Sequence, residues 1–162
     1  MRRLSLRFAI AMLTFVVGFA ATTGWRLFRP RFSRALEEAN IMEAVFRNQI
    51  AEQSSTEGKA VIFLSVVRDM DPSDEFMRRF ADMPLVRKVS QANKRGNGVT
   101  DKQTGERGII LDVHRLEWTS DAEVRVGVGT YAWGWGQSSS ICRVVHQNDK
   151  WVVQSCELTL IT

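Results

Sequence analysis

The sequence predicts an α+β domain in which two helices cover a curved antiparallel sheet, preceded by a membrane-directed helix. Three observations predict this class: an uncharged run between arginines at the start, two stretches with apolar residues at helical spacing, and four long alternating stretches in the C-terminal half. Helices that precede a series of hairpin-linked strands pack on one face of the sheet. We therefore expect a membrane segment at residues 1–32 and one domain at residues 33–162.

The first predicted element is a membrane helix at residues 8–25, an uncharged run that begins at Phe8 and ends at Trp25. As a helix it would span about 27 Å at ~1.5 Å per residue, close to the ~30 Å of a bilayer core. Arginines and Trp25 flank the run and suit lipid headgroups. A cleaved signal peptide is the alternative, because Gly18 and Ala20 are small enough for a signal peptidase.

The orientation of this helix does not follow from counting charges, because arginines lie on both sides of it. Export signals place basic residues before the apolar run and the domain after it. We therefore expect a single-pass cell-membrane protein that contacts the lipid bilayer through residues 8–25, with its domain on the outer, periplasmic side. Cleavage would instead release a secreted or periplasmic domain.

The positive charge of the chain is concentrated in its first residues. Up to Arg34 there are seven arginines and no acidic residue, whereas the remainder holds 15 basic and 18 acidic residues and has a net charge of −3. The sequence pI of about 9.5 therefore reflects the membrane segment. This distribution argues against nucleic-acid binding. The residues also lack the spacing of a metal site, so we expect neither a metal nor a cofactor.

The next elements are two helices separated by a short strand. Ser33 can cap a helix that continues to Ile50, where apolar residues recur at helical spacing. Residues 60–67 are predicted as a buried strand. Asp71 and Pro72 form a helix start, because Asp accepts bonds from free amides and Pro suits the first helical position. This second helix is predicted to end near residue 83.

The C-terminal half is predicted to be a meander of antiparallel strands. Residues 86–90 form a short strand, and the Gly- and Asn-containing stretch 93–108 is predicted as a loop. Four longer strands follow, at residues 108–118, 123–133, 138–146 and 151–160. The connections between these four are short, so each strand should pair with the next in antiparallel orientation.

This order of elements resembles the cone-shaped roll of the nuclear transport factor 2 (NTF2-like) and cystatin-like superfamily. The resemblance covers residues 35–160 and rests on the long first helix, the Asp71-Pro72 helix start and the final hairpin into residues 149–153. Residues 71–76 and 101–108 are also similar to uncharacterised bacterial proteins with an N-terminal anchor. The resemblance implies the fold but leaves function open, because the superfamily includes isomerases, dehydratases and noncatalytic domains.

Asp112 and His114 are the candidate catalytic residues. They are two positions apart on one predicted strand, so their side chains point to the same face. A carboxylate beside an imidazole can fix its tautomer and support a general base. An exposed polar pair at a sheet edge is the alternative, because the sequence places no nucleophile or metal ligand nearby.

Tyr131, Trp133 and Trp135 are the candidate ligand-binding residues. They alternate along one strand as it approaches Gly134 and Gly136, which places three rings at one end of the sheet. There they could line the mouth of the roll and contact a small apolar ligand. Alternatively, the rings pack under the hairpin as part of the core.

Cys142 and Cys156 are candidates for a disulfide between consecutive strands. A two-residue turn at Asn148-Asp149 pairs Cys142 with Ser155, which places Cys156 on the opposite face. A three-residue loop, or a bulge, would bring the two sulfurs within bonding distance. Two buried free thiols are the alternative.

The leading functional hypothesis is a membrane-anchored, exported and noncatalytic module that binds a protein partner or a small apolar ligand. One alternative is a small-molecule isomerase or hydratase that uses Asp112 and His114. Another is a self-assembling scaffold subunit that forms a homodimer through its sheet. An enzyme requires Asp112 or His114 inside a cavity, whereas an interaction module requires an exposed apolar patch or a free strand edge.

Overall fold

The computed structural model describes residues 32–56, 60–95, 98–132 and 136–161. The chain divides into two units, residues 1–36 and 37–162. The predicted membrane run at residues 8–25 lies outside the described residues. Within the described ranges, none of the helices combines the length and the apolar character needed to span a membrane.

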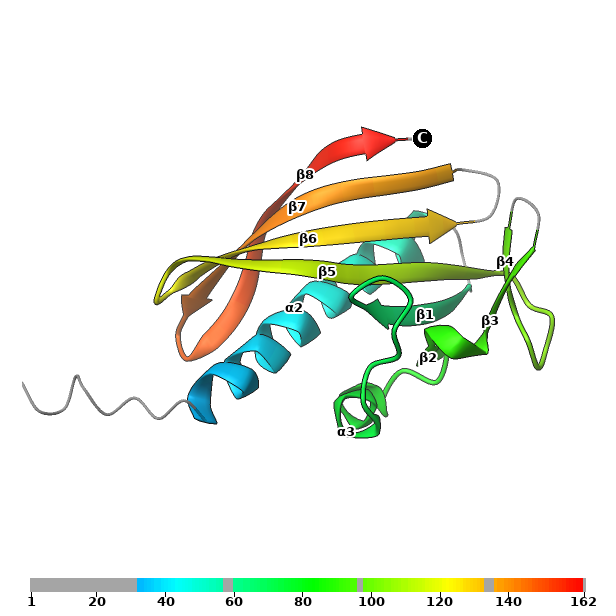
Figure 1. The fold of residues 1–162 in the computed structure, drawn as a ribbon, viewed down its shortest axis with the longest axis horizontal. Helices are drawn as coiled ribbons and strands as arrows, with labels where there is room; N and C mark the ends of the chain where they lie inside the picture. The colour runs from blue at the N-terminus through cyan, green and yellow to red at the C-terminus, as the bar shows by residue number, and fades with distance from the viewer. Residues whose placement is uncertain (1–31, 57–59, 96–97, 133–135, 162) are drawn as a thin grey trace, which may run out of the picture. The chain divides into compact units, whose positions relative to one another are not determined.

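The described part of the chain is α+β, with two α-helices and a body that consists mostly of sheet (Figure 1). The helical elements are α2 (Phe32–Thr56), α3 (Asp74–Met77) and the 3-10 helices η1 (Arg78–Phe80) and η2 (Val89–Gln91). The strands are β1 (Val61–Val66), β2 (Val86–Lys88), β3 (Ala92–Arg95), β4 (Gly98–Asp101), β5 (Gly108–Ser120), β6 (Glu123–Ala132), β7 (Gly136–Gln147) and β8 (Lys150–Ile161).

The main sheet has six strands in the order β2-β1-β5-β6-β7-β8. Strands β5 to β8 form the predicted antiparallel meander, which is confirmed. The prediction of an antiparallel sheet throughout is wrong, because β1 pairs in parallel with both β2 and β5. Parallel neighbours need a long crossover, and residues 67–107 between β1 and β5 provide one.

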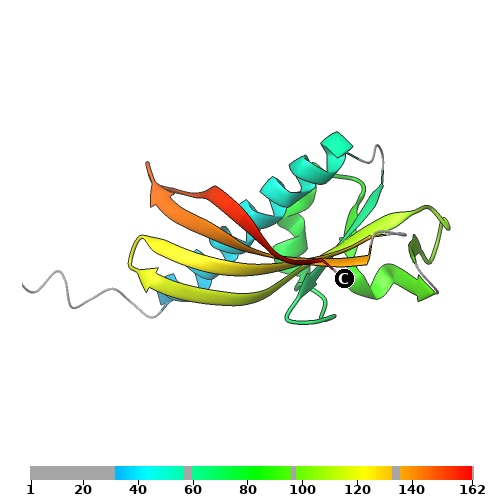
Figure 2. The ribbon, with the colours of Figure 1, turned by 90° about the horizontal axis from the view of Figure 1, so that it is seen from above.

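Helix α2 covers one face of this sheet, and the main core lies between them (Figure 2). Its buried residues recur at helical spacing, as predicted: Ile41, Val45, Phe46 and Ile50. The sheet contributes alternate residues to the same core, including Leu111 and Val113 of β5 and Val126 and Val128 of β6. The intervening residues of β5, such as Asp112, therefore point to the opposite face, which α2 does not cover.

The second predicted helix differs from the observed one at both ends. The N-cap is Ser73, whose Oγ accepts a hydrogen bond from Phe76 N at 3.1 Å, and not Asp71. The Asp71 carboxylate instead accepts a bond from Ser90 N at 2.8 Å. Helix α3 is one turn long and continues as the 3-10 helix η1 to Phe80, because Phe76 and Phe80 both pack edge-on against Phe46 of α2.

A small hairpin occupies the stretch predicted as a loop. Strands β3 and β4 pair in antiparallel orientation and pack on the second face of the sheet, where Ala92 and Val99 join Phe63 of β1 and Ile110 of β5 in a separate buried cluster. Asn93 and Gly98, two of the residues whose type indicated a loop, lie within the paired strands themselves. One part of the second face is therefore covered, and the part beside it is open.

Cys142 and Cys156 are joined by a disulfide. The turn between their strands has two residues, Asn148 and Asp149, both with positive φ, as expected for a hairpin turn of this length. That turn alone would pair Cys142 with Ser155. A bulge at Gln154 shifts the register by one residue, so Cys142 faces Cys156 with their Cα atoms 4.0 Å apart.

Candidate functional site

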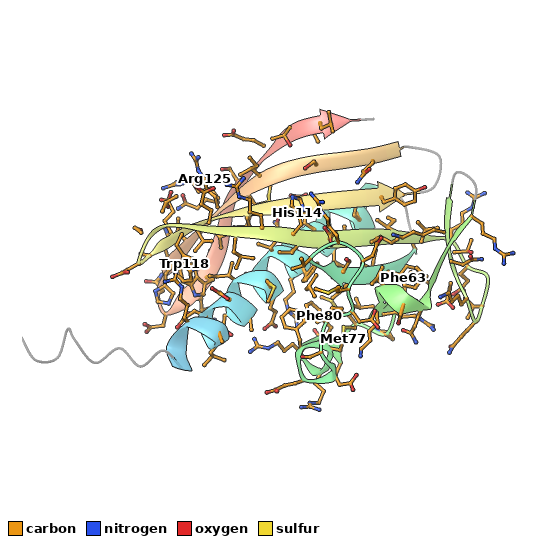
Figure 3. All side chains as sticks on the ribbon, in the orientation of Figure 1. Phe63, Met77, Phe80, His114, Trp118 and Arg125 are labelled. Carbon is orange, nitrogen blue, oxygen red and sulfur yellow. A yellow bond between two sulfur atoms is a disulfide. The ribbon has the colours of Figure 1, made fainter. Side chains whose placement is uncertain are left out.

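A cavity of about 660 Å³ lies on the open face of the sheet, beside the β3–β4 hairpin. Asp112, His114 and Tyr131, which the sequence analysis assigned to two separate candidate sites, all line this one cavity. His114 lies midway along β5 (Figure 3). Trp133 and Trp135, the other two ligand-binding candidates, lie outside the described residues. The structure therefore brings together every predicted catalytic residue and the one described aromatic candidate.

The Asp112 carboxylate is held by groups from three segments of the chain. Its Oδ1 accepts hydrogen bonds from Ser65 Oγ at 2.6 Å and from the backbone amide of Arg68 at 3.1 Å. Its Oδ2 lies 3.3 Å from Nδ1 of His114. Ser65 is fully buried and lies directly beside Asp112 in the parallel β1–β5 pair. Both carboxylate oxygens thus have partners within the protein.

His114 occupies a bulge in β5. The register of the β5–β6 pair shifts between Val113 and Arg115, so His114 has no cross-strand partner. Its ring lies over Gly127 of β6, where an added Cβ atom would be only 2.8 Å from Nε2. A proton on Nδ1 directed at Asp112 leaves Nε2 as a hydrogen-bond acceptor. The glycine therefore makes room for an imidazole that Asp112 orients.

A left-handed turn forms the rim of the cavity directly after β1. Val67, Arg68 and Asp69 have φ angles of 51°, 54° and 69°. Positive φ is uncommon outside glycine and is a strong outlier for a β-branched residue such as Val67. Three amides secure the turn: Val67 N donates to Val113 O at 3.0 Å, Arg68 N to Asp112, and Asp69 N to Ser65 Oγ at 2.9 Å.

Ser65 and Arg68 were not predicted as site residues. The turn contains no glycine or asparagine, and Asp69 is its one residue of a type that tolerates left-handed backbone, so the signal in its composition is weak. Ser65 appears in the sequence as one residue of a buried strand. The alternation of β1 would have placed it on the same face as Asp112, but only if the parallel pairing of the two strands had been known.

The remaining cavity lining is mixed in polarity. Ile110 forms a buried apolar wall and Leu160 an exposed one. Polar groups line the β6–β7 side, namely Thr130, Gln137, Ser138 and Ser139. Tyr131 both lines the cavity and packs against the cluster under the hairpin. It thus belongs both to the edge of this buried cluster and to the cavity wall.

The β3–β4 hairpin is tied to this site by one ion pair and to strand β2 by another. Lys94 of β3 pairs with Asp69 of the left-handed turn. Asp101 of β4, whose side chain is fully buried, lies 3.1 Å from the Arg87 guanidinium. Burial favours a higher pKa for Asp101, but the amides of Gln103 and Thr104 and the charge of Arg87 outweigh it, so the pKa lies below its ordinary value.

A second cavity, of about 540 Å³, lies between α2 and the β7–β8 turn. There the indole of Trp151 donates a hydrogen bond to Glu37 at 2.6 Å and packs against the ring of His146. His146 is exposed. This cavity contains none of the predicted site residues, and its polar groups connect the helix to the hairpin.

The described ranges contain no group of three or more His, Cys, Asp or Glu side chains arranged to hold a metal ion. No protein-family model, curated protein or solved structure matches this chain. The geometry of the site is therefore the basis for assigning a function.

Proposed function

We propose that this protein is a binding module that holds a small ligand in the cavity on the open face of its sheet. The observation that carries the proposal is the left-handed turn at residues 67–69, which Asp112 and Ser65 secure at the cavity rim. Residues in such conformations cost about 1–3 kcal/mol each and cluster at ligand sites and active sites. The cavity volume also lies within the ~300–1,000 Å³ of small-molecule sites.

A noncatalytic role is the simpler account of Asp112. A general base needs a carboxylate that is free to take a proton from the substrate. Asp112 uses both oxygens within the protein, one for the left-handed turn and one for His114. Its main effect is therefore to shape the cavity rim and to orient the imidazole.

The proposal can be tested by ligand screening with a variant that fills the cavity. Gly129 lines the cavity, and a Cβ atom there would make only an ordinary contact of 3.7 Å with Asp112. A Gly129→Leu variant should retain the fold and lose binding. Arg125→Leu is the matched control, because Arg125 is an exposed residue of the same strand outside the cavity lining.

The measurement is the amide NMR spectrum of the full chain in detergent micelles, recorded with a set of small fragments. We expect shifts at cavity residues of β5 and β6 that persist in Arg125→Leu and disappear in Gly129→Leu. Absence of any binding fragment, or binding that survives in Gly129→Leu, would contradict the proposal.

We propose further that the module is anchored in the cell membrane by residues 8–25, with its domain on the outer side. The disulfide between Cys142 and Cys156 supports this side, because disulfides persist in oxidising compartments. The packing of α2 on the antiparallel meander supports an NTF2-like roll as the fold type. A topology reporter fused after Thr162 tests the sidedness, and N-terminal sequencing of the mature protein tests whether the segment is cleaved.

An isomerase or hydratase is the second candidate, favoured by the oriented His114 inside the cavity. An enzyme of this kind would remove a proton from a carbon atom of the bound ligand through Nε2. NMR in D₂O would then show deuterium entering a bound carbonyl compound, with loss of exchange but not of binding in His114→Gln. A ligand that binds without exchange supports the noncatalytic module.

A self-assembling scaffold is the third candidate, favoured by strand β8. It pairs only with β7 among the described strands, and Leu158 and Leu160 on it are exposed. Two bulges, at Gln154 and Thr159, argue against this candidate, because bulges reduce edge-to-edge pairing of strands. Light scattering of the full chain in micelles tests this candidate, since a homodimer doubles the protein mass per particle.

A further inference from the structure

We propose that the ligand of this cavity carries a carboxylate group and that Arg68 recognises it. The inference rests on the proposed binding function and names the chemical class of the ligand. It follows from the charges around the cavity, the backbone that presents Arg68 and the polarity of the opposite wall.

The charged groups of the cavity lining are paired with one another, with one exception. Asp69 forms an ion pair with Lys94. Asp112 is held by the Ser65 hydroxyl, the amide of Arg68 and His114. Within the described residues, the guanidinium of Arg68 has no hydrogen-bond or ion-pair partner, although the residue lines the cavity. The cavity therefore has one cation available for an external anion.

The backbone gives Arg68 a defined position. Its own amide is bonded to Asp112, and the flanking amides of Val67 and Asp69 are bonded to β5 and β1. The turn that carries Arg68 is thus held at three successive amides in a conformation that non-glycine residues rarely adopt. The side chain of Arg68 is exposed at the cavity rim. A presented guanidinium suits a planar carboxylate, which it binds through two parallel hydrogen bonds.

The same arrangement limits repulsion from Asp112. Two donor groups, a buried hydroxyl and an amide, share the negative charge of this carboxylate, and Nδ1 of His114 lies 3.3 Å from its second oxygen. Asp112 would therefore repel a ligand carboxylate at Arg68 less strongly than an unpartnered carboxylate would. Across the cavity, Ser138, Ser139 and Thr130 offer neutral polar contacts, and Ile110 and Tyr131 offer an apolar wall. The expected ligand is a small organic acid with an apolar body.

Four probes separate the carboxylate from other features of the ligand. Benzoate has a carboxylate and an apolar ring, benzyl alcohol has a similar shape without charge, and phenyl phosphate has a larger anion. Inorganic phosphate is an anion without an apolar body. We expect benzoate to bind the full chain in micelles at least ~10-fold more tightly than each of the other three probes, with amide shifts centred on Ile110, Tyr131 and Ser139.

Three variants test the role of Arg68. Arg68→Gln should weaken the affinity for benzoate ~10-fold or more and leave the affinity for benzyl alcohol unchanged. Arg68→Lys should keep part of the affinity for benzoate, because lysine retains the positive charge but lacks the two parallel donors of the guanidinium. Arg125→Gln, on the open face outside the cavity, should bind as the unaltered protein does. Thermal unfolding checks that the variants fold, which is expected because the backbone amide of residue 68 is retained.

The outcomes distinguish this inference from the proposed function. If benzoate and benzyl alcohol bind equally, or if Arg68→Gln binds benzoate normally, carboxylate recognition by Arg68 is overturned while the cavity remains a binding site. Equal or tighter binding of either phosphate probe overturns the carboxylate class. If no probe binds and the fragment set also fails, the binding function itself is overturned.

Discussion

The backbone amide of Arg68 donates a hydrogen bond to the side chain of Asp112, with 3.1 Å between N and Oδ1. This single contact joins the rim of the cavity to its floor, because Arg68 follows β1 and Asp112 lies within β5. It also explains why Asp112 is an acid on a face that α2 leaves open. Its carboxylate accepts bonds that no apolar residue could accept.

Replacing Asp112 should loosen the left-handed turn. In Asp112→Ala the buried Ser65 hydroxyl and the Arg68 amide lose their acceptor, and an unsatisfied buried group costs about 1–3 kcal/mol. Asp112→Asn is the matched control, because both bonds go to Oδ1 and an amide oxygen in its place can still accept them, although more weakly than a carboxylate. We expect the urea unfolding midpoint to be highest for the unaltered protein, lower for Asp112→Asn and lowest for Asp112→Ala. Hydrogen exchange at the Arg68 amide should be faster in Asp112→Ala than in the unaltered protein. Equal midpoints for both variants would contradict this role.

Adding a methyl group at Gly127 should displace His114. The new Cβ atom would lie 2.8 Å from Nε2 of the imidazole, so the ring must move, at a cost of about 1–3 kcal/mol. Gly129→Ala is the control, because its Cβ atom would make only an ordinary contact. A double-mutant cycle with His114→Ala measures the coupling, and we expect the cost of Gly127→Ala to fall largely away in that background. An unchanged cost would show that the ring is not the obstacle.

The stability of the domain should decrease in acid partly because of Asp101. Its pKa is lower in the folded protein than its ordinary value, so the stabilisation is complete above the unfolded-state pKa of ~3.9. It is then lost as the pH falls toward the folded-state pKa. Asp101→Asn should lower the urea midpoint at pH 7 and flatten its dependence on pH between 5 and 3. The exposed turn residue Asp121, changed to Asn, should leave the slope nearly unchanged; the same slope in both variants would refute the assignment.

Removing the disulfide should destabilise the β7–β8 hairpin. The bond closes a short loop and faces the core beneath α2, since Cys142 is fully buried. The double variant Cys142→Ala/Cys156→Ala should lose about 2–4 kcal/mol, measured by urea unfolding. Dithiothreitol should lower the midpoint of the unaltered protein and have no effect on the variant. A reductant effect of equal size in both would show that it acts elsewhere.

Local patterns were sufficient to predict the meander and the helix face. The four strands β5 to β8 alternate in polarity and are joined by short turns, so each strand's partner is its neighbour in the sequence. The buried residues of α2 were likewise visible in their spacing, as with Val45 and Phe46. The position of Asp112 and His114 on one face followed from the two-residue period of a strand.

The rest depended on contacts between distant parts of the chain. The parallel pairing of β1 with β5 places Ser65 beside Asp112, and no local pattern encodes that choice of partner. The helix cap was misassigned because Asp71 and Ser73 are both good capping residues, and the bond from Phe76 N decides between them. The disulfide required a bulge at Gln154 that compensates for a two-residue turn, and a bulge leaves little trace in composition.

Because β1 pairs in parallel with β5, the residues that line the cavity come from two sections of the chain. Its floor belongs to the meander that begins at Gly108, whereas Arg68, Asp69 and Lys94 of the rim belong to the crossover at residues 67–107. Under the proposed binding function, substitutions at exposed rim positions of the crossover, such as Arg68 and Asp69, can therefore alter which molecules are admitted without disturbing the meander beneath. Homologous chains that share the scaffold could diversify in ligand choice by varying this single connection, much as antibodies vary their loops on a constant framework.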